Sequence, residues 1–136
     1  MPDLGSTEVT LLWASAALGL VHLLITVLAS VAARGMPWAL GPRDEPAADM
    51  GKIGARLERA YKNFLETFPL FAAAVLIEVS LGRQGGLGVL GAQLYFWGRL
   101  AYLPVYASGI PFARTAVWTI AFAGIVLVLV ACLPGI

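Results

Sequence analysis

Charged residues are scarce in this chain, since Asp, Glu, Lys and Arg make up only 12% of its 136 residues. A soluble domain carries about 25% charged residues, so this chain has too few to cover a surface that faces water. Hydrophobic residues make up 60% of the sequence, and the mean hydropathy is +0.83. The composition therefore predicts an integral membrane protein, and the short length leaves no room for a separate soluble catalytic domain.

Metal-binding residue types are nearly absent as well. The chain has one cysteine, Cys132, and one histidine, His22, so we expect no zinc or haem site within a single chain and no internal disulfide. The net charge is only +1, and no basic run carries interleaved aromatic residues. Nucleic acid is therefore not expected as a partner.

Long apolar stretches separated by polar turns are what the sequence does contain. A helix rises 1.5 Å per residue, so about 20 apolar residues cross a hydrocarbon core about 30 Å thick. We expect helices and no strands, because only helices and closed barrels satisfy their backbone hydrogen bonds in lipid. The sequence predicts a single all-α membrane domain over residues 1–136, with four transmembrane helices at about residues 9–33, 53–81, 87–106 and 115–133.

Basic residues are distributed unevenly between the two ends of the predicted bundle. One end holds most of them, namely Arg34, Arg43, Lys52, Arg56, Arg59, Lys62 and Arg114. The other end has only Arg83. By the positive-inside rule, loops 34–52 and 107–114 are predicted to be cytoplasmic and both chain termini external.

The second predicted helix has a polar first third, and beyond it three charged residues stand out within the predicted spans: Glu66, Glu78 and Arg99. A charge near the bilayer centre costs about 2.5 to 3.5 kcal/mol on insertion scales, so each of them needs a partner or a function. Glu78 is about one turn from the external end of its helix, where we expect its carboxylate to reach the lipid headgroups. Glu66 and Arg99 are deeper.

Two stripes of polar residues appear at helical spacing: Arg59, Asn63 and Glu66 on the second helix, and Arg99, Tyr102 and Tyr106 on the third. If Arg59 and Tyr106 lie level on antiparallel helices, Glu66 and Arg99 share one depth, about 10 Å below the cytoplasmic boundary. We therefore predict a structural ion pair between Glu66 and Arg99.

Arg114 opens the predicted fourth helix, where a basic side chain and free backbone amides favour an anion. A cationic cleft lined by phenol groups and open to the cytoplasm is predicted from Arg34, Arg59, Arg114, Tyr102 and Tyr106. The residues alone leave two interpretations open. The cluster is either an anion-binding site or a combination of positive-inside anchoring and interhelical hydrogen bonds.

The segment 58–69, ERAYKNFLETFP, resembles the helix-two signature E-R-A-x-x-N-x-x-E-x-x-P of the MAPEG family, the membrane-associated proteins in eicosanoid and glutathione metabolism. Arg99, Tyr102 and Tyr106 continue the likeness on the third helix. Residues 109–114 resemble the turn into the family's fourth helix. The resemblance extends over nearly the whole chain.

This resemblance implies a homotrimer of four-helix protomers that binds glutathione between subunits near the cytoplasmic face and takes an apolar electrophile from the bilayer. One protomer would hold the peptide part of glutathione through Arg59, Asn63 and Glu66. The next protomer would contribute Arg34, Tyr102, Tyr106 and Arg114. The resemblance also implies that Arg114 stabilises the glutathione thiolate.

The sequence departs from leukotriene-synthase-like members, because Thr67 follows Glu66 where they carry a tyrosine, and Ser108 replaces an arginine seen in some of them. The short connection from Tyr106 to Arg114 resembles a bacterial subgroup, which implies a bacterial inner membrane. Two functions stay open: a glutathione transferase or peroxidase, or a non-enzymatic trimer that binds a lipid or an anionic metabolite in the same cleft. A small multidrug transporter is disfavoured, because residues 9–33 contain no acidic residue.

Overall fold

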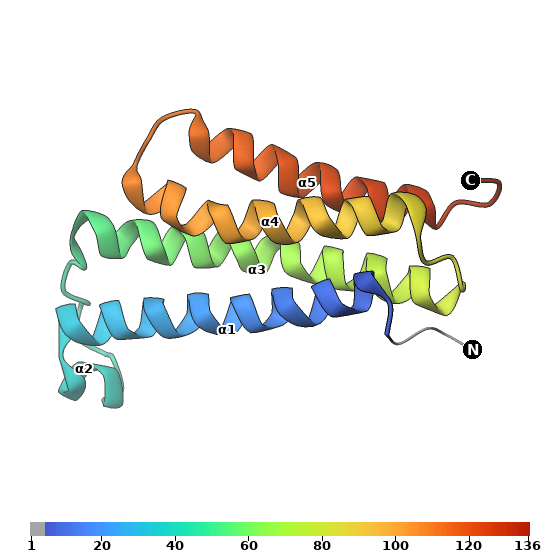
Figure 1. The fold of residues 1–136 in the computed structure, drawn as a ribbon. Coiled ribbons are helices and arrows are strands. Elements are labelled where there is room, and N and C mark those ends of the chain that lie inside the picture. Colours follow the sequence, from blue (N-terminus) through green and yellow to red (C-terminus); the bar gives the residue numbers. More distant parts are fainter. Residues whose placement is uncertain (1–4) are drawn as a thin grey trace.

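The computed structural model describes residues 5–136, so the first four residues of the predicted domain lie outside the described part. The described chain is helical and contains no strand. Its helices are α1 (Thr7–Arg34), α2 (Met36–Leu40), α3 (Gly51–Ser80), α4 (Gly86–Ser108) and α5 (Ala113–Ala131). The four long helices alternate in direction, so that α2 and the α4–α5 turn lie at one end of the bundle (Figure 1). The start of α1, the α3–α4 turn and the end of α5 lie at the other end.

The ends of the long helices follow local signals in the sequence. Ser6 caps α1, because its hydroxyl accepts a hydrogen bond from the Val9 amide at 3.4 Å. α4 continues two residues beyond the predicted end at Tyr106 and stops at Gly109, whose φ of 72° lies in the left-handed region that glycine adopts readily.

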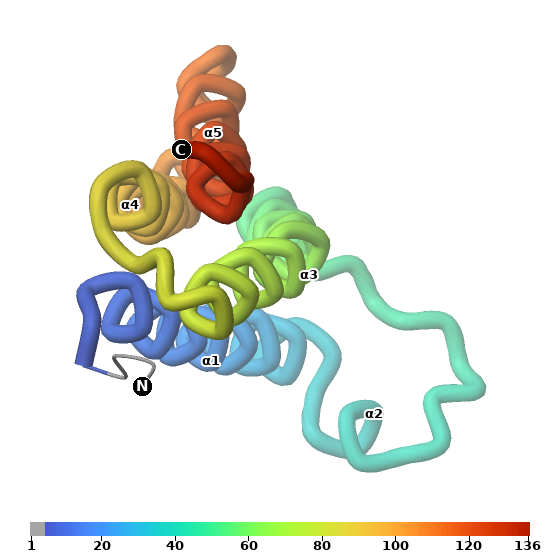
Figure 2. The backbone as a smooth tube through the Cα atoms, turned by 90° about the vertical axis from the view of Figure 1, so that its right-hand side faces the viewer, coloured from blue at the N-terminus to red at the C-terminus, as the bar shows by residue number. Residues whose placement is uncertain are grey.

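The sequence pattern predicts a loop where the structure has the short helix α2. It has Gly35 and Gly41 at its ends and Pro37 in its first turn, which is a favourable place for proline because no amide hydrogen is needed there. Five residues are too few to produce a recognisable helical period, so the sequence pattern could not separate α2 from the surrounding turns. Viewed along the bundle, α2 projects to one side, away from α4 and α5 (Figure 2).

Three helices are long and apolar enough to cross a membrane: α1, the segment Gly51–Leu81 that contains α3, and α5. Large apolar side chains on them are exposed, for example Leu28 on α1 at 67% and Leu70 on α3 at 57%. Such exposure is unfavourable in water and expected in lipid. The chain is an integral membrane protein.

The core is formed mainly by α3, α4 and α5. Phe71 on α3 stacks on Tyr95 on α4 with ring centroids 4.0 Å apart, and both side chains are fully buried. α4 and α5 approach so closely that a Cβ added at Gly91 would lie 2.6 Å from the Gly124 carbonyl oxygen. A Cβ at Gly124 would lie 2.5 Å from the Gly91 oxygen. Glycine at both positions therefore sets the helix spacing, as small residues do in membrane bundles.

Glu78 does not reach the headgroups, so that prediction is wrong. Its side chain is fully buried, and neither carboxylate oxygen has a hydrogen-bond partner among the described residues. Gly88 of α4 leaves the space that the carboxylate fills, and Glu8 of α1 is buried within electrostatic range. Helix rotation turns Glu78 toward α4, which its distance from the helix end could not reveal.

Candidate functional site

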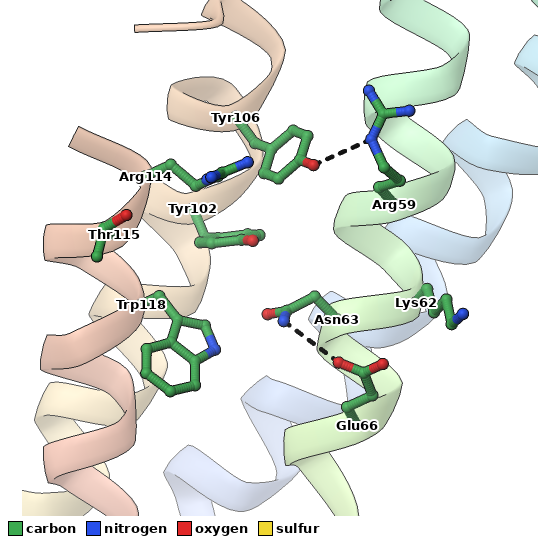
Figure 3. Close-up of a pocket in the computed structure, with 9 residues that line it drawn as sticks. All are labelled: Arg59, Lys62, Asn63, Glu66, Tyr102, Tyr106, Arg114, Thr115 and Trp118. Atoms are coloured by element: carbon green, nitrogen blue, oxygen red, sulfur yellow. Dashed lines mark hydrogen bonds between the residues drawn. The ribbon is translucent and has the colours of Figure 1, made fainter. Parts of the chain in front are cut away.

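A cavity of about 430 Å³, the main cavity, lies between α3 and the α4–α5 pair. Figure 3 shows side chains from the three helices facing one another across it. Its lining consists of Arg59, Lys62, Asn63 and Glu66 from α3, Tyr102 and Tyr106 from α4, and Arg114, Thr115 and Trp118 from α5. Its α5 residues are in the first two turns of that helix, which begins at the same end of the bundle as α3 (Figure 1).

Six of the seven residues predicted to bind or activate glutathione line this cavity within one chain: Arg59, Asn63, Glu66, Tyr102, Tyr106 and Arg114. The resemblance implies that the α3 residues of one protomer meet Arg34, the two tyrosines and Arg114 of the next. In the structure the α3 residues, the two tyrosines and Arg114 meet within one chain. The reason is that α4 runs antiparallel to α3 and therefore ends near the start of α3. After a short turn, α5 begins at this same end of the bundle.

Arg34 lies apart from these six residues. It lines a separate cavity of about 280 Å³ together with residues of α1, α2 and α3. Its guanidinium is 4.7 Å from the centre of the Trp38 ring and donates hydrogen bonds to the Ala48 carbonyl and the Ser30 hydroxyl, each 3.1 Å long. Within one protomer, therefore, Arg34 does not join the predicted cleft.

Tyr106 lies between two arginines. The Arg59 Nε donates a 3.1 Å hydrogen bond to the Tyr106 hydroxyl (Figure 3). The Arg114 guanidinium carbon is 5.4 Å from the centre of the Tyr106 ring, within the range of a cation–π contact. The ring thus links α3 to the first turn of α5 and helps to hold both guanidinium groups in place.

Arg99 is fully buried and contacts residues beneath the cavity. Its guanidinium donates hydrogen bonds to Asn63 Oδ1 at 2.8 Å and to Thr67 Oγ1 at 2.5 Å. Asn63 in turn donates from Nδ2 to Glu66 at 3.4 Å. The direct ion pair predicted between Glu66 and Arg99 is thus replaced by a bridge through Asn63. The Glu66 side chain is exposed, whereas Arg99 points into the bundle, so equal depth does not bring their charges together.

Sequence reasoning did not assign a role to Thr67, although it noted the residue as a departure from the family pattern. The Thr67 hydroxyl contacts Arg99 and lies 3.3 Å from the Tyr95 hydroxyl. Its position four residues after Asn63 on α3 was a usable signal, because that spacing puts both residues on one helix face. Trp118, four residues after Arg114, carries the same signal on α5.

The charge of the main cavity favours an anionic ligand that also carries an amine. Arg59, Lys62 and Arg114 supply three cations, and Glu66 supplies the one carboxylate of the lining. Arg114 also lies in the first turn of α5, where the helix dipole adds partial positive charge. No group of three or more His, Cys, Asp or Glu residues suited to a metal occurs within the part of the chain that the structure describes.

A comparison with models of protein families matches residues 10–134 to the MAPEG family. The chain belongs to the MAPEG family. The match includes all of α3, α4 and α5, so every residue that lines the main cavity lies within the matched region. Membership indicates a function related to glutathione transferases and peroxidases or a related membrane function. Comparisons of this MAPEG protein with curated sequences and with solved structures give no match.

Proposed function

We propose that this MAPEG protein is a membrane-bound glutathione transferase or peroxidase that acts on an apolar electrophile. The observation that supports the proposal most directly is the main cavity itself. Four polar residues of α3 line a space of about 430 Å³ together with two tyrosines of α4 and an arginine of α5. Pockets for small molecules have volumes of about 300 to 1,000 Å³, so the size suits a tripeptide in extended contact with the walls.

The chemistry of the lining fits glutathione, which has two carboxylates, one amine and one thiol. Arg59 and Lys62 suit the carboxylates, because guanidinium and ammonium groups form charge-assisted hydrogen bonds with them. Glu66 suits the amine, and the Asn63 amide suits the peptide groups. Arg114 lies on the opposite wall of the cavity, where it would face the thiol.

The proposed role of Arg114 is to stabilise the thiolate. A free thiol has a pKa of about 8.5, so at neutral pH most of it is protonated and weakly nucleophilic. Lowering this pKa by about two units requires about 2.7 kcal/mol of preferential stabilisation of the anion. Arg114 can supply a permanent positive charge, because a guanidinium does not lose its proton in proteins. Its contact with the Tyr106 ring keeps that charge near one position.

Bound glutathione would supply the nucleophilic sulfur for either reaction. In the transferase reaction a carbon–sulfur bond forms while the bond to the leaving group of the electrophile breaks. Arg114 holds the negative charge on sulfur until that bond forms, and the α3 residues keep the peptide part in place. Trp118 and Thr115 would border the side from which an apolar substrate arrives.

We further propose that α4 is a fourth membrane span. Its 23 residues extend about 34 Å, enough to cross the hydrocarbon core. The Arg99 charge does not oppose this, because its side chain is fully buried in the bundle instead of facing lipid. Four spans put both termini on the external side and the 34–52 and 107–114 loops in the cytoplasm, as the basic residues favour. The membrane would be a bacterial inner membrane.

We also propose a homotrimer. Glu66 and Arg59 are exposed in the isolated protomer, and Glu66 is about one to two helical turns within the membrane in the proposed orientation. Association of protomers would remove these groups from lipid, and Arg34 of a neighbouring protomer would complete the site. The number three rests on the family resemblance. Chemical cross-linking in mild detergent should give dimers and trimers, and a ladder with only monomers or even-numbered species would contradict it.

The enzyme proposal is tested with the wild-type protein, glutathione and a panel of apolar electrophiles, including an organic hydroperoxide. We expect conjugation or peroxide reduction, and ultraviolet absorbance of a bound thiolate at neutral pH. If calorimetry shows that glutathione binds, but neither thiolate absorbance nor turnover is detected, the enzyme proposal is wrong. That result would favour a non-enzymatic trimer that binds an anionic metabolite or a lipid in the same cavity.

A further inference from the structure

A second cavity of about 470 Å³ adjoins the main one on the other side of Tyr106. The two cavities share Arg59, Tyr106, Arg114 and Thr115. The second cavity adds Arg56 of α3, Val105 of α4 and the α4–α5 turn, residues 109–112. It lies at the end of the bundle that carries most of the basic residues, and the main cavity does not include Arg56.

The charge of the second cavity has one sign. Its lining contains three arginines, Arg56, Arg59 and Arg114, and no acidic residue. Three guanidinium groups around one space repel each other, most strongly where water is limited. The main cavity has Glu66 to offset its cations, whereas nothing in this lining does so. An anion with more than one acceptor oxygen would offset the charge and bind several donors at once.

Arg56 is held in place by the backbone of the α4–α5 turn. Its guanidinium donates a 3.1 Å hydrogen bond to the Ala107 carbonyl. Gly109, with φ of 72°, lies so close that an added Cβ would be 2.5 to 2.6 Å from atoms of the guanidinium. Glycine suits both this backbone conformation and the close approach of the arginine. A side chain already ordered in this way loses less entropy when it binds a ligand.

Apolar side chains flank the cavity on the turn. Ile110 is 57% exposed and Phe112 is 86% exposed, although both stand beside a cluster of three arginines. In the orientation proposed above, this turn lies at the cytoplasmic surface of the bilayer. There, an arginine cluster meets headgroups while neighbouring apolar side chains meet the upper part of the acyl chains. A free anion in water would make no favourable contact with these exposed apolar side chains.

We propose that the second cavity binds the phosphate of an anionic phospholipid from the cytoplasmic leaflet. Arg56 and Arg114 supply donors from two sides, and the N-terminal turn of α5 adds backbone amides and partial positive charge. Ile110 and Phe112 contact the acyl chains. The inference rests on the proposed orientation of the chain and does not require that glutathione binds or reacts, so the two proposals fail separately.

The test uses full-length protein stripped of lipid in a neutral detergent. Phosphatidylglycerol and phosphatidylcholine with identical acyl chains are added, and retained lipid is measured by native mass spectrometry alongside the melting temperature. The wild type should retain phosphatidylglycerol about tenfold better, and only this lipid should raise the melting temperature. Arg56→Gln should lose the preference. Arg43→Gln should keep it, because Arg43 is on the same side of the protein but outside the lining of this cavity.

Three results would overturn the proposal: no headgroup preference in the wild type, the full preference in Arg56→Gln, or its loss in Arg43→Gln. Arg56→Lys, which keeps the charge and the space, guards against a folding defect and should retain a reduced preference. Inorganic phosphate tests the source of the anion. If it stabilises the wild type as much as phosphatidylglycerol at equal concentration, the ligand is free phosphate and the lipid assignment is wrong.

Discussion

Arg99 of α4 donates a 2.8 Å hydrogen bond to the side-chain carbonyl oxygen of Asn63 on α3. Asn63 lines the main cavity, whereas Arg99 is fully buried behind it. By engaging the carbonyl oxygen, Arg99 orients the Asn63 amide so that its nitrogen faces Glu66. A buried charge thus controls the geometry of two cavity residues without lining the cavity itself, which makes Arg99 a positioning residue.

Arg99→Lys should raise the KM for glutathione several-fold and lower thermal stability. A lysine ammonium is a single point charge and cannot reproduce the planar fork that contacts Asn63 and Thr67 together. Loss of one hydrogen bond to a charged group costs about 1.5 to 3 kcal/mol. Arg83→Lys is the matched control, because Arg83 contacts the Cys132 and Leu133 carbonyls at the far end of the bundle. Unchanged glutathione affinity in Arg99→Lys would contradict the positioning role.

Arg114→Ala should lower turnover while leaving glutathione affinity largely intact, since the proposed interaction strengthens as the thiol loses its proton. Arg59→Ala should mainly raise the glutathione KM, because the proposed contact of Arg59 with a glutathione carboxylate is the same before and during the reaction. Thiolate absorbance at neutral pH should vanish in Arg114→Ala and persist in Arg59→Ala at saturating glutathione. If absorbance persists in both variants, another group activates the thiol.

Glu78→Gln should raise the melting temperature in detergent. Glu78 and Glu8 are both buried and interact electrostatically, so a second negative charge beside Glu8 destabilises the bundle. A neutral amide of the same shape removes the repulsion. Glu66→Gln should change stability little, because Glu66 is exposed in the protomer, but should weaken glutathione binding. If depth in the membrane decided stability, the change at Glu66 would have the larger effect, because Glu66 is deeper than Glu78. The comparison therefore tests whether burial in the bundle or depth in the membrane governs stability.

Gly124→Ala should reduce stability by about 1 to 3 kcal/mol or prevent assembly, because overpacking forces backbones apart. The added methyl group would collide with the Gly91 carbonyl and with the Tyr95 backbone, neither of which can rotate away. Gly98→Ala is the control on α4, since its Cβ would meet Ala121 at 3.1 Å, a contact that a small shift relieves. Urea or thermal unfolding in detergent should give a clearly larger loss for Gly124→Ala.

Much of the candidate site could be predicted because helical spacing is a local property. Arg59, Asn63 and Glu66 share a face of any helix that contains them, and the antiparallel arrangement brings Tyr102 and Tyr106 opposite. The family resemblance, confirmed by the match to residues 10–134, came from the same short motifs. The pattern did not predict α2, because five residues carry no usable period.

Hydropathy and backbone hydrogen bonding in lipid depend on composition along the chain. They were therefore enough to predict the membrane environment, the helical class and the approximate ends of the four long helices. The sequence pattern did not show which side chains contact each other. Arg99 contacts Asn63 instead of Glu66, Glu78 turns inward beside Glu8, and Arg34 lies in a cavity of its own. These outcomes depend on the rotation of each helix about its axis and on the spacing that Gly91 and Gly124 permit. Residue depth and periodicity do not specify either quantity.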